Sequence, residues 1–256
     1  MKWTPFPYTT DHSFDTAKLR RDWAHLHAGD CEPLPDSTEV LGAWLLFHRG
    51  DFHQAVEAGL AAGPAGITVA NKAACVHANY LEPREKLRLE RFMEAAERAQ
   101  TQTAADPNNP NAWYLQAYAL GRYSQGISVA KALAQGIGTR VKSALERSIA
   151  LQPRHADAHI ALASFHAEVI DKVGSLIGGM TYGASKETGL ALYRKALELN
   201  PGSAIAMIEY ANGLVMLEGD ERLDEATHLY QRAADTKPMD ALERLEVELA
   251  KAELAS

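Results

Sequence analysis

A nine-residue pattern that ends in proline occurs three times in this chain of 256 residues. It reads YRKALELNP at 193–201, LERSIALQP at 145–153 and YQRAADTKP at 230–238. Each copy has a helix-forming composition and stops at a proline, which a helix interior does not tolerate. A unit that recurs in this way indicates a chain built from copies of one supersecondary structure.

The match extends to both sides of the closing prolines. Pro107, Pro153 and Pro201 are each followed ten residues later by an alanine: Ala117, Ala163 and Ala211. Five residues before the closing proline, each copy has a small residue: Ser148, Ala196 and Ala233. Small residues at fixed positions allow two helices to approach closely. The repeat therefore predicts pairs of tightly packed helices.

This template resembles the tetratricopeptide repeat (TPR), a helix-turn-helix unit of 34 residues. The resemblance covers about residues 39–238 and is most specific in RLDEATHLYQRAADTKP at 222–238. It implies an all-α, right-handed superhelix of about five antiparallel helix pairs. We expect an N-terminal segment at 1–38 with a short helix from about Asp15 to His27, a repeat domain at 39–238 and a capping helix at 239–256.

Two of the repeats are much longer than the family's 34 residues. The spacing is 46 residues from Pro107 to Pro153 and 48 from Pro153 to Pro201, whereas it is only 37 from Pro201 to Pro238. We expect the added residues to lengthen both helices of two pairs, which meet at glycine-rich tips. Such long repeats are similar to those of the regulator of microtubule dynamics family and of the T component of TRAP transporters. The segment that carries this resemblance is AEVIDKVGSLIGGMTYGASKETGLALYRKALELNPG at 167–202.

Charge and composition exclude several classes of function. The formal net charge is −7, from 26 Lys and Arg against 33 Asp and Glu, whereas nonspecific nucleic-acid binding needs clustered positive charge. No stretch approaches the roughly 20 apolar residues of a membrane span. The first residues, MKWTPFPYTTDHSFD, lack the apolar run of a secretory signal. We therefore expect a cytoplasmic protein.

Residues that could perform chemistry are scattered. Cys31 and Cys75 are in no CxxC motif and cannot form a disulfide framework. His155 and His159 share a helix face, but His159 is at the packing position that Trp113 occupies in another repeat. No nucleophile, phosphate-loop or metalloprotease motif is present. We therefore predict no enzyme activity, no metal site and no cofactor.

The resemblance implies that the first helix of each pair lines a concave binding surface. The template gives one stripe on each of these helices, and the stripes also contain Cys75, Ile160, Ile208 and Met216. From them we predict ligand- or partner-binding residues: Asn71, Asn79, Tyr114, Tyr118, Arg122, Ser164, Glu168 and Asn212. Mixed polar and aromatic surfaces suit peptide recognition. The alternative is that the tyrosines pack on the neighbouring pair and leave only their hydroxyls in water.

The sequence thus favours a non-catalytic TPR-like scaffold or adaptor that binds a protein or peptide. A second hypothesis is a carrier of a small apolar ligand or lipid, in a cavity of the lengthened pairs. Its expected lining is Ile127, Leu133, Leu176 and Met180. A third is that these apolar extensions form a homo-oligomer interface, because large exposed apolar stripes seldom remain in water.

Overall fold

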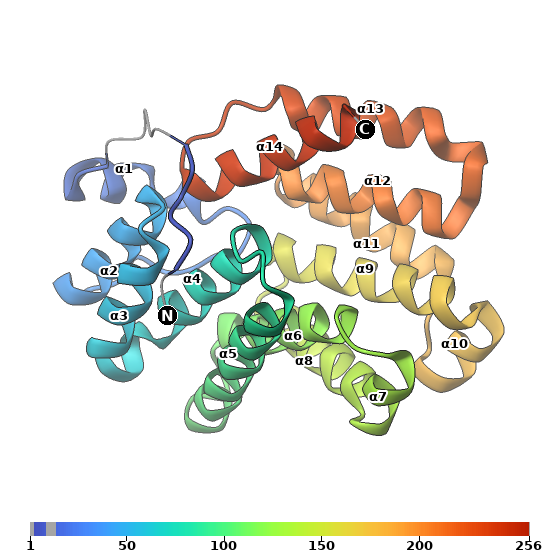
Figure 1. Ribbon diagram of the computed structural model, residues 1–256, viewed down its shortest axis with the longest axis horizontal. Coiled ribbons are helices and arrows are strands. Elements are labelled where there is room, and N and C mark those ends of the chain that lie inside the picture. Colours follow the sequence, from blue (N-terminus) through green and yellow to red (C-terminus); the bar gives the residue numbers. More distant parts are fainter. Residues whose placement is uncertain (1–2, 9–13, 256) are drawn as a thin grey trace. The chain divides into compact units, whose positions relative to one another are not determined.

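The computed structural model describes residues 3–8 and 14–255, and all regular elements in this part of the chain are helices (Figure 1). The chain divides into two compact units. Unit 1 comprises the described residues up to His27 together with Glu32–Gln152 and Asp240–Leu242. Unit 2 comprises Ala28–Cys31, Pro153–Met239 and the described residues from Glu243 onward. The all-α, TPR-like fold expected from the repeats is confirmed.

Unit 1 begins with α1 (Thr16–Leu26) and continues with three helix pairs. The first pair is α2 (Thr38–Arg49) with α3 (Phe52–Ala61), and the second is α4 (Ile67–Tyr80) with α5 (Glu85–Ala105). A short 3-10 helix, η1 (Gly63–Gly66), joins these two pairs. The third pair is α6 (Pro110–Gln125) with α8 (Ile137–Leu151), and α7 (Val129–Ala134) lies between them in the chain.

Unit 2 contains two further pairs and most of a terminal helix. The pairs are α9 (Ala156–Val173) with α11 (Lys186–Leu199), and α12 (Ala204–Glu218) with α13 (Leu223–Asp235). Along the chain, α10 (Ser175–Tyr182) connects the two helices of the first of these pairs, and the 3-10 helix η2 (Gly219–Arg222) connects those of the second. Helix α14 (Ala241–Leu254) places Val247 and Ala250 in the core of this unit. A last helix that covers the terminal core is what the sequence predicted.

In the last three pairs, a polar residue just before the first helix of the pair fixes where that helix begins. Asn109 accepts a hydrogen bond from the backbone N–H of Ala112, and Ser203 accepts one from Ala206, so both are N-caps. His155 performs the same task for α9, because its Nδ1 accepts from Ala158 N at 3.1 Å. The expected helix near the N-terminus begins at Thr16, where Asp15 caps it.

The small residues of the template lie where helices approach most closely. Ala163, Ala196, Ala211 and Ala233 are all fully buried. At Gly213 the approach is closer still, since a Cβ there would lie 2.3 Å from the Tyr193 ring. Burial of these positions explains why the repeats keep alanine, serine or glycine at them.

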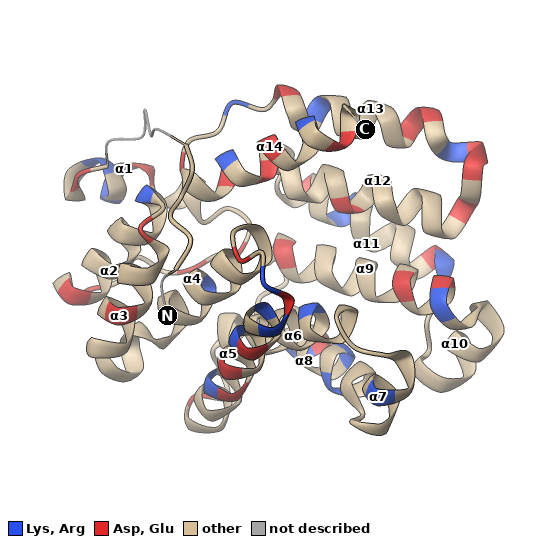
Figure 2. Ribbon diagram, in the orientation of Figure 1, with Lys and Arg blue, Asp and Glu red and all other residues tan. Residues whose placement is uncertain are grey.

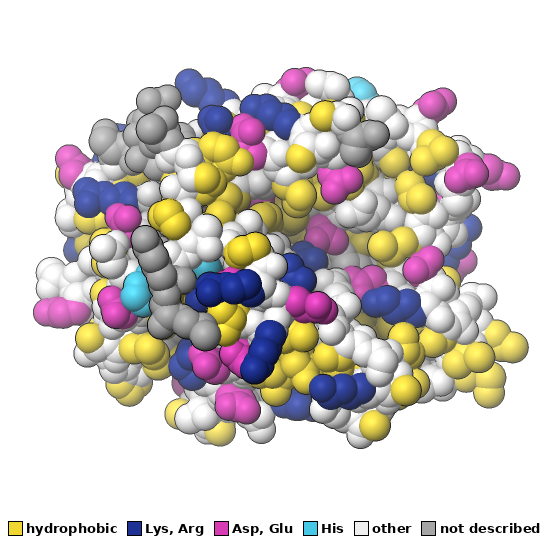
Figure 3. Space-filling view, in the orientation of Figure 1, with side chains coloured by type: hydrophobic (Ala, Val, Ile, Leu, Met, Phe, Trp, Pro, Cys, Tyr) yellow, Lys and Arg dark blue, Asp and Glu magenta, His cyan; other side chains and the backbone are white. Residues whose placement is uncertain are grey.

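The inserts differ from the prediction, because they form separate short helices, α7 and α10, rather than lengthening both members of a pair. Gly126 ends α6 and Ser128 caps α7, while Gly174 has a positive φ of 81° between α9 and α10. Helix α10 contains no charged residue (Figure 2). Its Leu176, Ile177 and Met180 are exposed, and hydrophobic side chains gather at this part of the surface (Figure 3).

Candidate functional site

Helix α6 presents the aromatic stripe that the sequence predicted. The Tyr114 and Tyr118 ring centroids are 6.0 Å apart, and both side chains are half-buried. The Arg122 guanidinium carbon lies 5.3 Å from the Tyr118 ring centroid, and Arg122 Nη1 donates to Gln125 Oε1 at 3.2 Å. We call Tyr114, Tyr118 and Arg122 the α6 face. It combines a planar cation with two amphipathic rings in one line along a helix.

Asn71 on α4 is fully buried. Arg98 of α5 donates from Nε to Asn71 Oδ1 at 2.8 Å, and burial lowers the pKa of Arg98. In the described part of the chain, Asn71 Nδ2 has no hydrogen-bond partner. Asn71 therefore holds the guanidinium of Arg98 in place and is not itself at the surface.

The same stripe of α4 contains Cys75 and Asn79. Cys75 is buried, and burial raises the pKa of its thiol to about 12, against the opposing effect of the positive charges of Arg98 and Arg122. Asn79 is half-buried one turn further on. A buried thiol with so high a pKa is neutral at physiological pH and is a poor nucleophile. Both guanidinium groups are therefore close enough to Cys75 to act on its thiol.

In unit 2, Ser164 of α9 is bonded to buried neighbours. Its Oγ lies 3.0 Å from Tyr193 Oη, and it donates to Glu209 Oε2 at 3.1 Å. The Tyr193 ring stacks on Tyr210 with centroids 5.2 Å apart. Burial raises the pKa of Tyr193 far above its usual value. Ser164 therefore connects the surface of α9 to the core.

The other two predicted residues of unit 2 also have partners. Asn212 Oδ1 accepts from Tyr230 Oη at 2.6 Å, and Glu168 pairs with Lys172 at 3.1 Å, four residues along α9. Ile160 and Ile208, from the same stripes, are buried, whereas Met216 is exposed. With Glu168 and Glu209 both half-buried, the predicted surface of unit 2 carries carboxylates where the surface of unit 1 carries guanidinium groups.

The residues expected to line an apolar cavity are placed differently. Leu176 and Met180 of α10 are 74% and 83% exposed, and Leu133 of α7 is 48% exposed. Ile127 is half-buried. These positions thus provide exposed apolar surface, and no observation supports the ligand-carrier alternative.

The histidines have structural contacts. His159 Nδ1 lies 2.9 Å from the backbone oxygen of His155, within the first turn of α9. In unit 1, His48 Nδ1 lies 2.6 Å from Asp240 Oδ2, and His48 Nε2 lies 3.3 Å from His27 Nε2. All three side chains of this second group are buried, so it joins α1 and α2 inside the core. Among the described residues, no three potential metal ligands gather in one place.

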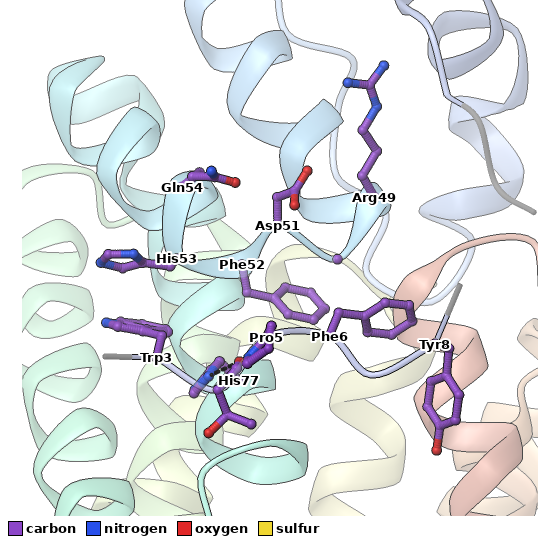
Figure 4. Close-up of a pocket in the computed structure, with 12 residues that line it drawn as sticks. Trp3, Pro5, Phe6, Tyr8, Arg49, Asp51, Phe52, His53, Gln54 and His77 are labelled. Atoms are coloured by element: carbon purple, nitrogen blue, oxygen red, sulfur yellow. Dashed lines mark hydrogen bonds between the residues drawn. The ribbon is translucent and has the colours of Figure 1, made fainter. Parts of the chain in front are cut away.

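The sequence interpretation missed a pocket at the start of unit 1. Residues 3–8 cross the turn between α2 and α3, and a pocket of about 510 Å³ lies between this segment and the helices (Figure 4). Its lining includes Trp3, Phe6, Phe52, His53 and His77. The sequence signal for it is the alternation of aromatic residues and prolines in WTPFPY, which by itself indicates no particular surface.

Sequence comparison identifies the family. The family described as "Regulator of microtubule dynamics protein 1-3" matches residues 66–255, which is most of the chain. The chain belongs to this family. Among curated proteins, none matches the sequence.

Solved structures with similar folds are TPR proteins. TTC0263, a thermophilic TPR protein from Thermus thermophilus, gives a TM-score of 0.58 at 18% identity, covering 84% of this chain and 97% of that chain. YrrB, described as a TPR protein with an unusual peptide-binding site, gives a TM-score of 0.42 at 15% identity, covering 90% and 97%. The first likeness shows the fold. None of these comparisons indicates an enzyme family.

Proposed function

We propose that this member of the family is a non-catalytic module that binds a peptide or protein through the α6 face. The observation that carries the proposal is the alignment of Tyr114, Tyr118 and Arg122 on one half-buried helix face, with Arg98 held nearby by Asn71. Tyrosine and arginine are the residue types that most often dominate the binding energy of protein interfaces.

The electrostatics support a particular class of partner. A guanidinium group binds a carboxylate through two parallel hydrogen bonds, and tyrosine rings beside it provide apolar contact area with a polar edge. We therefore infer that the α6 face receives a peptide with an acidic residue next to an aromatic or apolar one. Asn79, on the adjacent helix α4, would contact the same peptide.

The predicted residues of unit 2 form a second candidate surface. Ser164, Glu168 and Asn212 are polar and half-buried, and Glu209 adds a carboxylate beside Ser164. Carboxylates favour a basic peptide over an acidic one. Ser164 and Asn212 bond to tyrosines of their own unit. The α6 face combines two tyrosines with an arginine, the residue types that most often dominate interface energy, and we propose it as the primary site.

The proposal can be tested with an array of short synthetic peptides that vary independently in acidic and aromatic content. We expect the full-length protein to bind acidic–aromatic peptides, and to bind them more weakly at high salt because the charges are near the surface. Tyr118→Ala combined with Arg122→Ala should weaken this binding by about 2 kcal/mol or more. His228→Ala, an exposed position on α13, is the matched control.

Two results would refute the proposal. One is equal binding of acidic–aromatic and neutral peptides. The other is unchanged affinity in the double variant while its melting temperature falls, which would place these residues in the core rather than at a binding surface. Because the family description refers to microtubule dynamics, polymerised tubulin is a suitable first protein for the same comparison of wild type and double variant.

A further inference from the structure

The segment Trp3–Tyr8 packs on the helices of unit 1, and its first aromatic residue contacts three of them. The Trp3 ring stacks on His53 with centroids 4.8 Å apart and meets His77 edge-on at 4.4 Å. The Arg91 guanidinium carbon lies 4.0 Å from the same ring centroid. Figure 4 shows Trp3 beside His53 at one end of the segment and Phe6 beside Phe52 further along. Trp3 is thus surrounded by groups from α3, α4 and α5.

A chain of buried polar groups ends on the backbone of this segment. Glu82 pairs with Arg91 at 2.7 Å, and Arg91 Nη1 donates to His77 Nδ1 at 2.7 Å. His77 must then carry its hydrogen on Nε2, which donates to the Thr4 backbone oxygen at 2.9 Å. Burial lowers the pKa of His77 to about 4, so the ring is neutral at physiological pH. The helices therefore offer a fixed N–H donor to a peptide carbonyl.

The second aromatic residue fits where the helices leave space for it. Gly50 ends α2 with φ of 89°, and a Cβ at this position would lie 2.7 Å from Phe6 Cγ. The Phe6 ring meets Phe52 edge-on at 6.3 Å. Pro5 and Pro7 have no N–H and favour an extended polyproline conformation, which loses little entropy on binding.

We propose that this surface is a peptide-recognition site for extended segments that carry two aromatic side chains three residues apart with proline between them, and that Trp3–Tyr8 is its intramolecular occupant. Glu82, in the loop between α4 and α5, bonds to Arg91 of α5, and Arg91 bonds to His77 of α4. Their donor is directed at a main-chain oxygen, which every peptide has. The cation beside Trp3 and the space above Gly50 select aromatic side chains.

The partner is a protein segment of the same chemistry, which competes with residues 3–8 for the site. Trp3, Phe6 and Tyr8 remain half-buried, and the pocket of about 510 Å³ stays open beside them. The occupant is therefore not sealed into the core. None of the residues of the α6 face contributes to this site, so the two proposals stand or fall separately.

Fluorescence anisotropy with a labelled peptide that has the sequence of residues 1–8 tests this site in the full-length chain. The Trp3→Ala, Phe6→Ala double variant should bind the peptide at least about tenfold more tightly than wild type, because it has lost the internal competitor. A peptide with alanine in place of its tryptophan and phenylalanine should not bind. Adding His53→Ala to the double variant should weaken binding, whereas adding His228→Ala should not.

The proposal is overturned if the double variant keeps the wild-type melting temperature and binds the peptide no more tightly than wild type. Should the double variant melt early, the wild-type chain provides the decisive measurement. A peptide with a photoreactive benzophenone at its sixth position should label residues 50–54, and excess unlabelled peptide should suppress this labelling. Labelling confined to other parts of the chain would refute the site.

Discussion

The two units use one repeat template but present different chemistry on their first helices. In unit 1 the α6 face places Arg122 over Tyr118, with Arg98 nearby on α5. In unit 2 the corresponding helices place Glu209 beside Ser164, which is bonded to the buried Tyr193. The template therefore determines which positions must be small and buried, and leaves the polar positions free to diverge.

Tyrosines make the contrast sharpest, because Tyr193 is buried and Tyr118 is half-buried. Tyr193→Ala should lower the free energy of unfolding by about 3–5 kcal/mol, since it removes a large ring from a packed core and leaves a cavity. Tyr118→Ala should change it by less than about 1 kcal/mol. Chemical denaturation of both variants measures the difference. Equal losses would mean that the α6 face is part of a core.

Substitutions of alanine test the feature that the two units share, a small buried residue where two helices approach closely. Ala117 in unit 1 and Ala233 in unit 2, both positions of the repeat template, are buried. Replacing either with leucine should destabilise the protein by about 1–3 kcal/mol, because it overpacks a close helix contact. Ala130→Leu, at an exposed position on α7, is the control. An unchanged denaturation midpoint in either core variant would disprove the proposed repeat register there.

The hydroxyl of Tyr193 gives a smaller effect that depends on pH. Tyr193→Phe keeps the stacking on Tyr210 and loses the hydrogen bond to Ser164, which should cost about 1 kcal/mol. Burial raises the pKa of Tyr193 above the value of about 10 that it has in the unfolded chain. The stabilisation that the neutral Tyr193 hydroxyl gives the folded state is therefore complete below pH about 10. It is lost as the pH rises further. Chemical denaturation should show that the free energy of unfolding falls more steeply at alkaline pH in the wild type than in Tyr193→Phe.

Repeat positions and helix pairs could be predicted from the sequence, because proline, alanine and capping residues act locally. The burial of Asn71 could not, since helical spacing shows which residues share a face but not whether a neighbouring helix covers it. The prediction for the inserts was wrong for a similar reason. Glycine indicates where a helix is interrupted, but Gly126 and Gly174 give no indication that the residues beyond them form a helix of their own.

The pocket beneath residues 3–8 depends on contacts between distant parts of the sequence. Trp3 meets His53, His77 and Arg91, which are 50 to 88 positions away. Aromatic–proline alternation predicts an extended segment. It does not predict the surface on which that segment lies, because no local rule relates Thr4 to His77.

Hydrogen–deuterium exchange of the full-length chain, with and without the tightest acidic–aromatic peptide from the array, tests the central claim most directly. The account predicts that the peptide slows exchange of backbone amides in α6, around Tyr114–Arg122, and in the adjacent part of α4. Exchange in α9 and α12 of unit 2 should remain unchanged. Protection confined to the helices that carry Ser164 and Asn212, with α6 unaffected, would contradict the assignment of the α6 face as the primary binding surface.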